Sequence, residues 1–140
     1  MAIGDILPSG LSSVPAPEET LARALFTSNH FSTSGPKSQA FMPARDNETS
    51  VFRQCDSDLT LLRAACDAAA LGHGKPAKQV AVTTVGHVVS SGLSVVPSEP
   101  PPRHANIAGW PSAADPEREK ADRKLVALKI AESAWLVPVP

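Results

Sequence analysis

The amino-acid sequence predicts a small α+β domain, in which about three helices cover one face of a short, mainly antiparallel sheet and Pro-rich irregular segments join the elements. Three observations support this fold class. The chain has 140 residues, the size of one domain, so residues 1–140 are assigned to a single folded unit. Hydrophobic residues make up 42% and charged residues 19%, the balance of a globular protein with a buried core. Segments with helical apolar spacing alternate with short β-branched runs, and 14 prolines interrupt the backbone between them.

The N-terminal half is predicted to contain an extended segment, a helix and a hairpin. Residues 1–17 hold three prolines and two glycines, which favours an extended entry segment over a regular element. A helix is expected from Pro17 to about Ser28, because proline suits the first helical position and the following apolar residues have helical spacing. Residues 39–42 and 49–53 have strand character, and the polar loop between them favours an antiparallel hairpin.

The C-terminal half is predicted to be richer in helix. A second helix is expected from about Asp58 to Gly72, where glycine suits a left-handed C-terminal residue. The β-branched composition of residues 79–97 predicts a strand, a short helical turn and a second strand. Residues 97–111 are expected to form a loop that four prolines stiffen.

A third helix is predicted over residues 115–136. Asp115 suits the cap position, Pro116 the first helical position, and two glutamates follow in the first turn. Its expected buried stripe consists of Ala121, Leu125, Leu128, Ala131 and Trp135.

Composition argues against several classes of protein. The 13 Lys and Arg residues are balanced by 14 Asp and Glu residues, which removes the simplest argument for a nucleic-acid binder. No apolar stretch approaches the roughly 18 residues of a membrane span, so no membrane partner is expected. The two cysteines, Cys55 and Cys66, lack zinc-site spacing, and neither a metal nor another cofactor is expected. The N-terminus does not resemble a signal peptide, which favours a soluble cytoplasmic protein.

The signature motifs of nucleotide, zinc and serine-hydrolase sites are missing, so candidate catalytic residues must come from isolated polar side chains. We select His30, Arg53, His104 and Asn106. Imidazoles titrate near neutral pH and suit acid and base roles, whereas the planar fork of an arginine binds phosphate oxygens. Structural roles remain open for each: His30 suits a helix C-terminus, and Arg53 can pair with a nearby aspartate.

One short run resembles a known family. The sequence His30-Phe31-Ser32-Thr33 is similar to one half of the tandem His-x-Ser/Thr pattern of the two-histidine phosphoesterases. A second copy is missing, because His87 is followed by Val-Val-Ser and His104 by Ala-Asn-Ile. The chain is therefore not assigned to that family.

Two functions remain open at this point. The first is a binding module that docks a protein partner through the Pro-rich loop with Arg103 and Trp110, while the wide apolar arc of the third predicted helix favours association with a second copy of the chain. The alternative is a small enzyme acting on a nucleotide or phosphodiester through the four catalytic candidates. Nucleic-acid binding ranks behind both. An enzyme requires its candidates to meet in one pocket, whereas a docking module requires an exposed apolar patch near Trp110.

Overall fold

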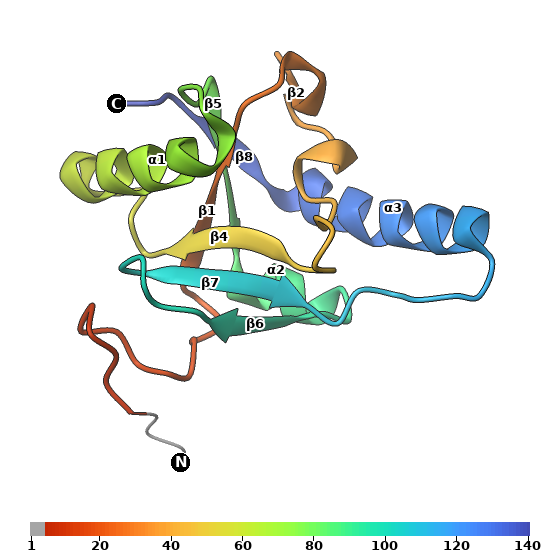
Figure 1. Ribbon diagram of the computed structural model, residues 1–140, viewed down its shortest axis with the longest axis horizontal. Coiled ribbons are helices and arrows are strands. Elements are labelled where there is room, and N and C mark those ends of the chain that lie inside the picture. Colours follow the sequence, from red (N-terminus) through yellow and green to blue (C-terminus); the bar gives the residue numbers. More distant parts are fainter. Residues whose placement is uncertain (1–4) are drawn as a thin grey trace.

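The computed structural model describes residues 5–140 and contains a six-stranded antiparallel sheet in the order β6-β7-β4-β1-β5-β8 (Figure 1). Its strands are β1 (Thr20–Leu25), β4 (Thr49–Arg53), β5 (Gln79–Thr84), β6 (Ser94–Pro97), β7 (His104–Ala108) and β8 (Trp135–Val137). A separate pair consists of β2 (Phe31–Ser32) and β3 (Gly35–Pro36). The helices are α1 (Leu59–His73), α2 (Val85–Ser90) and α3 (Pro116–Ser133), with the 3-10 turns η1 (Ser28–His30) and η2 (Ser38–Ala40). The predicted α+β class, with three helices and a mainly antiparallel sheet, is confirmed.

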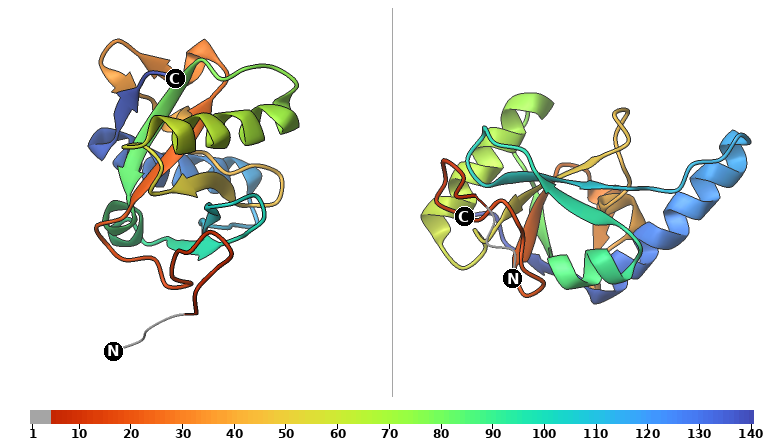
Figure 2. Two further views of the ribbon diagram at one scale, coloured as in Figure 1. Left: turned by 90° about the vertical axis from the view of Figure 1, so that its left-hand side faces the viewer. Right: turned by 90° about the horizontal axis from the view of Figure 1, so that it is seen from below.

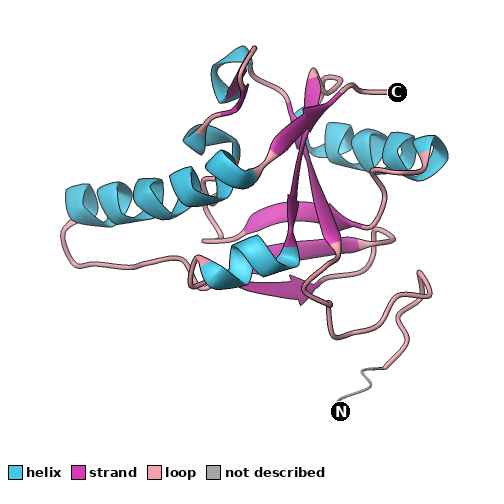
Figure 3. Ribbon diagram, turned by 180° about the vertical axis from the view of Figure 1, so that it is seen from behind, coloured by secondary structure: helices cyan, strands magenta, loops and turns pink. Residues whose placement is uncertain are grey.

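Helices cover both faces of the sheet, where the sequence predicted one (Figure 2). On one face, Leu62 and Cys66 of α1 pack against strand residues such as Ala22. On the other face, α2 and α3 pack against residues such as Leu21; Figure 3 shows α2 lying across the strands there. The reason is visible in β5, where Val80, Ala81 and Val82 are all buried although neighbouring side chains point to opposite faces.

The sheet opens between β1 and β4. β1 pairs with β5 along its whole length but with β4 at only two positions, Leu21 with Arg53 and Ala22 with Phe52. Beyond Ala22 the strands diverge, and Figure 1 shows β1 and β5 running steeply behind β4. This divergence leaves the later residues of β1 without backbone partners on the β4 side, and the candidate site lies there.

Two predictions for the N-terminal half are wrong. Residues 20–25 form strand β1, because the spacing from Leu21 to Leu25 places both side chains on one face of a strand as well as on one face of a helix, and pairing with β4 and β5 selects the strand. Residues 38–40 form η2, not a strand, so the predicted hairpin is absent from the described residues. β4 pairs with β1 and β7 instead.

The central part of the chain follows the prediction closely. Asp58 caps α1 by accepting hydrogen bonds from the N–H groups of Thr60 (2.9 Å) and Leu61 (3.2 Å). The helix continues one residue past Gly72 to His73 and is capped by Gly74, which adopts a left-handed φ of 71°. The predicted strand, helical turn and strand of residues 79–97 are confirmed as β5, α2 and β6.

The predictions for residues 97–136 need three corrections. Residues 104–108 form strand β7 in the sheet, so the Pro-rich loop is limited to the β6–β7 connection and a second irregular stretch after β7. α3 begins as predicted, with Asp115 as its cap, but ends at Ser133, and Trp135 belongs to β8. Its buried residues are Ala127, Ile130 and Ala131, whereas Leu125 of the predicted stripe is 63% exposed.

Candidate active site

A cleft of about 280 Å³ lies where β1 and β4 diverge beneath the C-terminal half of α1. Four polar side chains line it: Arg23 from β1, Ser50 from β4, His73 from the end of α1 and His104 from β7. Phe26 and Phe52 are among its apolar walls. The cleft therefore combines one fixed cation, two imidazoles and a hydroxyl in one concave surface.

Ser50 and His104 form a hydrogen-bonded pair in this cleft. In the β4–β7 register, His104 lies opposite Phe52 and Asn106 opposite Ser50, which makes Ser50 a diagonal neighbour of His104 on the same face. The distance from Ser50 Oγ to His104 Nε2 is 2.6 Å. The other ring nitrogen, Nδ1, lies 2.8 Å from the carbonyl oxygen of Ser98.

These contacts fix the tautomer of His104. A carbonyl oxygen only accepts, so Nδ1 carries the proton and donates it to Ser98. The lone pair of Nε2 then accepts the hydrogen bond from the Ser50 hydroxyl. A hydroxyl bonded to an imidazole, with that imidazole held by a third group, is the arrangement by which enzymes activate a serine.

The connection between β6 and β7 is anchored, which holds the Ser98 carbonyl in place. The Glu99 carboxylate accepts hydrogen bonds from the N–H of Ser9 (3.0 Å) and the N–H of Arg103 (3.2 Å). Burial alone raises the pKa of Glu99, but the hydrogen bonds from Ser9 and Arg103 outweigh it and leave that pKa below its usual value. The N–H of Ser98 also donates to the carbonyl of His104 at 2.9 Å.

Arg23 occupies the gap between the diverging strands. Its Nη1 donates to the carbonyl of Ser50 at 2.8 Å, and its Nε donates to the carbonyl of Ala40. Burial lowers its pKa to about 10, so the guanidinium keeps its charge at neutral pH. Within residues 5–140 it has no carboxylate partner, and its Nη2 donates no hydrogen bond to the protein.

Two further histidines lie within electrostatic reach of Arg23. His73 stacks on Phe26, with ring centroids 3.8 Å apart, and lines the cleft. Burial lowers its pKa, and the positive charges of Arg23 and Lys75 lower it further. Burial also lowers the pKa of His30 in η1, with smaller contributions from Arg23 and His73. Both imidazoles are therefore neutral at pH 7 and able to take up a proton when an anion enters.

One predicted catalytic residue, His104, lines the cleft. Asn106 lies opposite Ser50 on the same face of the sheet and His30 lies in η1, and neither is among the residues that line the cleft. Arg53 lies elsewhere: it is fully buried, and its Nη2 forms a salt bridge with Glu19 at 2.9 Å rather than with the aspartates that follow it.

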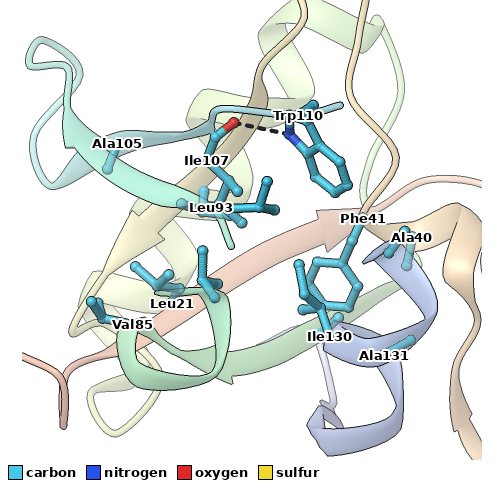
Figure 4. Packing of buried hydrophobic residues seen from close by; sticks show 14 of the residues in the cluster. Leu21, Ala40, Phe41, Val85, Leu93, Ala105, Ile107, Trp110, Ile130 and Ala131 are labelled. Carbon is cyan, nitrogen blue, oxygen red and sulfur yellow. Dashed lines mark hydrogen bonds between the residues drawn. The ribbon is translucent and has the colours of Figure 1, made fainter. Parts of the chain in front are cut away.

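The predicted docking residues are occupied within the fold. Trp110 is 7% exposed and packs in the core, where its indole N–H donates to the carbonyl of Ile107 at 3.2 Å (Figure 4). The Arg103 guanidinium donates to the carbonyl of Gln54 at 2.7 Å and more weakly to that of Arg53 at 3.4 Å. Trp110 therefore offers little surface to a partner, and docking through it stays a prediction.

Sequence reasoning missed Ser50, Arg23 and His73. One signal was present for Ser50, which is a polar residue between the apolar positions of a predicted strand. Its relation to His104 depends on the β4–β7 register, over a separation of 54 residues. Arg23 was assigned to a helix, and His73 was expected in a solvated loop.

Comparison of the chain with protein-family models, with curated proteins and with solved structures gave no match. Within residues 5–140, no group of three His, Cys, Asp or Glu side chains has the geometry of a metal site. The same residues include no helix with the length and apolar character needed to cross a membrane.

Proposed function

We propose that this chain is a small enzyme that hydrolyses phosphate esters, with Ser50 as nucleophile and His104 as general base. The observation that carries the proposal is the hydrogen bond of 2.6 Å between Ser50 Oγ and His104 Nε2, within a cleft that also contains Arg23. A partly buried cation without a carboxylate partner favours an anionic substrate, because the guanidinium fork matches phosphate oxygens.

The reaction begins with attack of Ser50 Oγ on phosphorus. His104 Nε2 accepts the hydroxyl proton, and the bond from phosphorus to the alcohol oxygen, which lies in line with the attack, breaks while solvent water protonates the departing oxygen. Water then attacks the phosphoserine from the side that the alcohol left and releases its proton to solvent, and His104 Nε2 returns its proton to the Ser50 oxygen as that oxygen leaves. Arg23 balances the charge on the phosphate oxygens in both steps.

The test is turnover of p-nitrophenyl phosphate and bis(p-nitrophenyl) phosphate by the purified protein. We expect Ser50→Ala to abolish turnover, and His104→Gln to lower kcat by about 10² to 10⁴, the range for loss of a general base. Ser90→Ala is the matched control, because Ser90 is an exposed serine of α2 outside the cleft. Full turnover by Ser50→Ala would refute the proposal.

Docking of a second copy is a second candidate, supported by exposed apolar residues on α3, the helix from which the sequence also favoured association. Leu125 and Leu128 lie one turn apart on α3 and are 63% and 43% exposed. Sedimentation over a range of concentrations tests this candidate. A dimer that dissociates in Leu125→Glu would support it, and a monomer at every concentration would refute it.

A further inference from the structure

A second, smaller hollow of about 80 Å³ adjoins the cleft. Phe52, Ala68 and Pro101 line both spaces, so the hollow continues from the cleft beneath α1. Its other walls include Leu61 and Ala65 of α1 and are almost entirely apolar. The combined space therefore has a charged end at Arg23 and an apolar end between α1 and the β6–β7 connection.

We propose that this hollow binds the organic part of the substrate, and that the substrate is a phosphate ester of a short aliphatic alcohol. The inference rests on the proposed function and specifies which phosphate esters the cleft accepts. It disfavours nucleotides, because a nucleobase is a ring system too large for the hollow.

The size of the hollow sets the size of the group. An engineered cavity of about 150 Å³ binds benzene, so a space of 80 Å³ is too small for an aromatic ring. At about 30 Å³ for each small group in a condensed phase, it holds a chain of about three carbons. A longer chain must extend past the hollow into solvent.

The walls of the hollow favour an uncharged group. Burial raises the pKa of the Cys55 thiol to about 12, and the nearby Asp56 carboxylate contributes to the same shift, so the thiol is neutral. Arg103 also borders the hollow, but its Nη1 already donates to the carbonyls of Arg53 and Gln54. Among residues 5–140, Arg103 is the one charged side chain in this wall, and its guanidinium is already hydrogen-bonded to the protein, so an ionised ligand finds no free counter-charge here.

The hollow lies next to the proposed catalytic pair. The Phe52 ring borders the hollow and packs edge-on against the His104 imidazole, with ring centroids 5.4 Å apart. An alkyl group in the hollow therefore lies one side chain away from the imidazole that activates Ser50, and its phosphate can occupy the adjoining cleft.

The experiment measures binding of methyl, ethyl, propyl, butyl and hexyl phosphate to the Ser50→Ala protein by calorimetry. We expect affinity to rise about fourfold for each methylene up to about three carbons, the factor for moving a methylene from water to an apolar site, and then to level off. Phenyl phosphate should bind more weakly than propyl phosphate. Affinity that is independent of chain length, or that favours the phenyl ester, would overturn the inference.

A second test uses Leu61→Ala in the same Ser50→Ala background, where we expect tighter binding of the longer alkyl phosphates. Removing the Leu61 side chain enlarges the hollow, so we expect the preferred chain to become longer. Leu71→Ala is the control, because Leu71 lies on the same helix and is 87% exposed. An unchanged preference in a folded Leu61→Ala protein would also overturn the inference.

These outcomes separate the two proposals. Chain-length dependence without turnover of any phosphate ester by the wild-type protein would support the subsite and refute the catalytic role of Ser50. Turnover without chain-length dependence would refute the subsite alone.

Discussion

Two arginines on neighbouring strands, Arg53 fully buried and Arg23 partly buried, have opposite surroundings. Arg53 of β4 is enclosed completely, and its guanidinium meets the Glu19 carboxylate at 2.9 and 3.0 Å and the Ser12 carbonyl at 2.8 Å. Arg23 of β1 lines an open cleft and, within residues 5–140, donates to two backbone carbonyls and to no carboxylate. The comparison shows that the group paired with an arginine side chain indicates its role better than the extent of its burial. Arg53 is neutralised by a carboxylate, and Arg23 is available to an anion.

The largest effect should come from breaking the Arg53 pair. Glu19→Ala leaves a buried guanidinium without its counter-charge, and we expect a loss of about 3–5 kcal/mol in the free energy of unfolding, measured by urea denaturation. Glu18→Ala, at the exposed neighbouring position, should change it by less than about 0.5 kcal/mol. Equal stability of both variants would show that Arg53 does not depend on Glu19.

Substituting Arg23 should weaken anion binding much more than it weakens the fold. We expect Arg23→Gln to lower the affinity for sulfate at least about tenfold, because the only fixed charge of the cleft is lost. The stability cost should stay near 1–2 kcal/mol, the approximate cost of the lost hydrogen bonds to two carbonyls. Arg63→Gln, at an exposed arginine of α1, is the control. Unchanged sulfate affinity in Arg23→Gln would remove the contrast between the two arginines.

A smaller effect should appear when the affinity for sulfate is measured as a function of pH. Burial and the Arg23 charge lower the pKa of His73, whereas a bound anion offsets that charge and favours the protonated ring. Sulfate keeps its charge, so its affinity should rise several-fold between about pH 7.5 and about pH 5.5, the range in which histidines gain protons. His73→Asn should reduce the rise, while His30, which also faces Arg23, should retain part of it. An affinity for sulfate that does not change with pH in the wild-type protein would contradict the link between anion binding and protonation of His73.

The smallest effect concerns the influence of the Arg53 charge on the pKa of the Glu99 carboxyl. Arg53 contributes to the lowered pKa of Glu99, after the hydrogen bonds from Ser9 and Arg103. A lowered carboxyl pKa stabilises the fold above the usual carboxyl pKa, and this stabilisation is lost as pH falls through the lowered value. Glu99→Gln should therefore cost less than about 1 kcal/mol at pH 7 and flatten the acid limb of the stability curve. A cost as large as that of Glu19→Ala would mean that Glu19 alone does not neutralise Arg53.

The sequence predicted those parts of the fold that local chemistry decides. Asp58 and Asp115 cap their helices as expected, and the β-branched run at residues 79–84 forms a strand. The segment around Leu21 was misassigned, because its apolar spacing fits both a helix and a strand and only pairing with β4 and β5 distinguishes them. The buried face of α3 was predicted only in part. Ala131 of the predicted stripe is buried, whereas Leu125 and Leu128 are exposed and Ala127 and Ile130 are buried in their place.

The candidate site was predicted less completely than the fold. His104 was a candidate from the sequence and lines the cleft, but its partner Ser50 lies 54 residues earlier in the chain, and their contact depends on strand register. Arg53 was chosen because it ends a strand near a helix, yet Glu19, 34 residues earlier, already neutralises it. Pairing between distant segments decides both outcomes, and such pairing leaves no local pattern in the sequence.

The most direct measurement is the reaction of the protein with a fluorophosphonate, followed by peptide mass spectrometry. Ser50 Oγ displaces fluoride and forms a bond to phosphorus only if His104 removes its proton. We expect the label on Ser50 in the wild-type protein, and its loss in His104→Gln. Labelling of Ser50 no faster than that of Ser90, or labelling that persists without His104, would contradict the account.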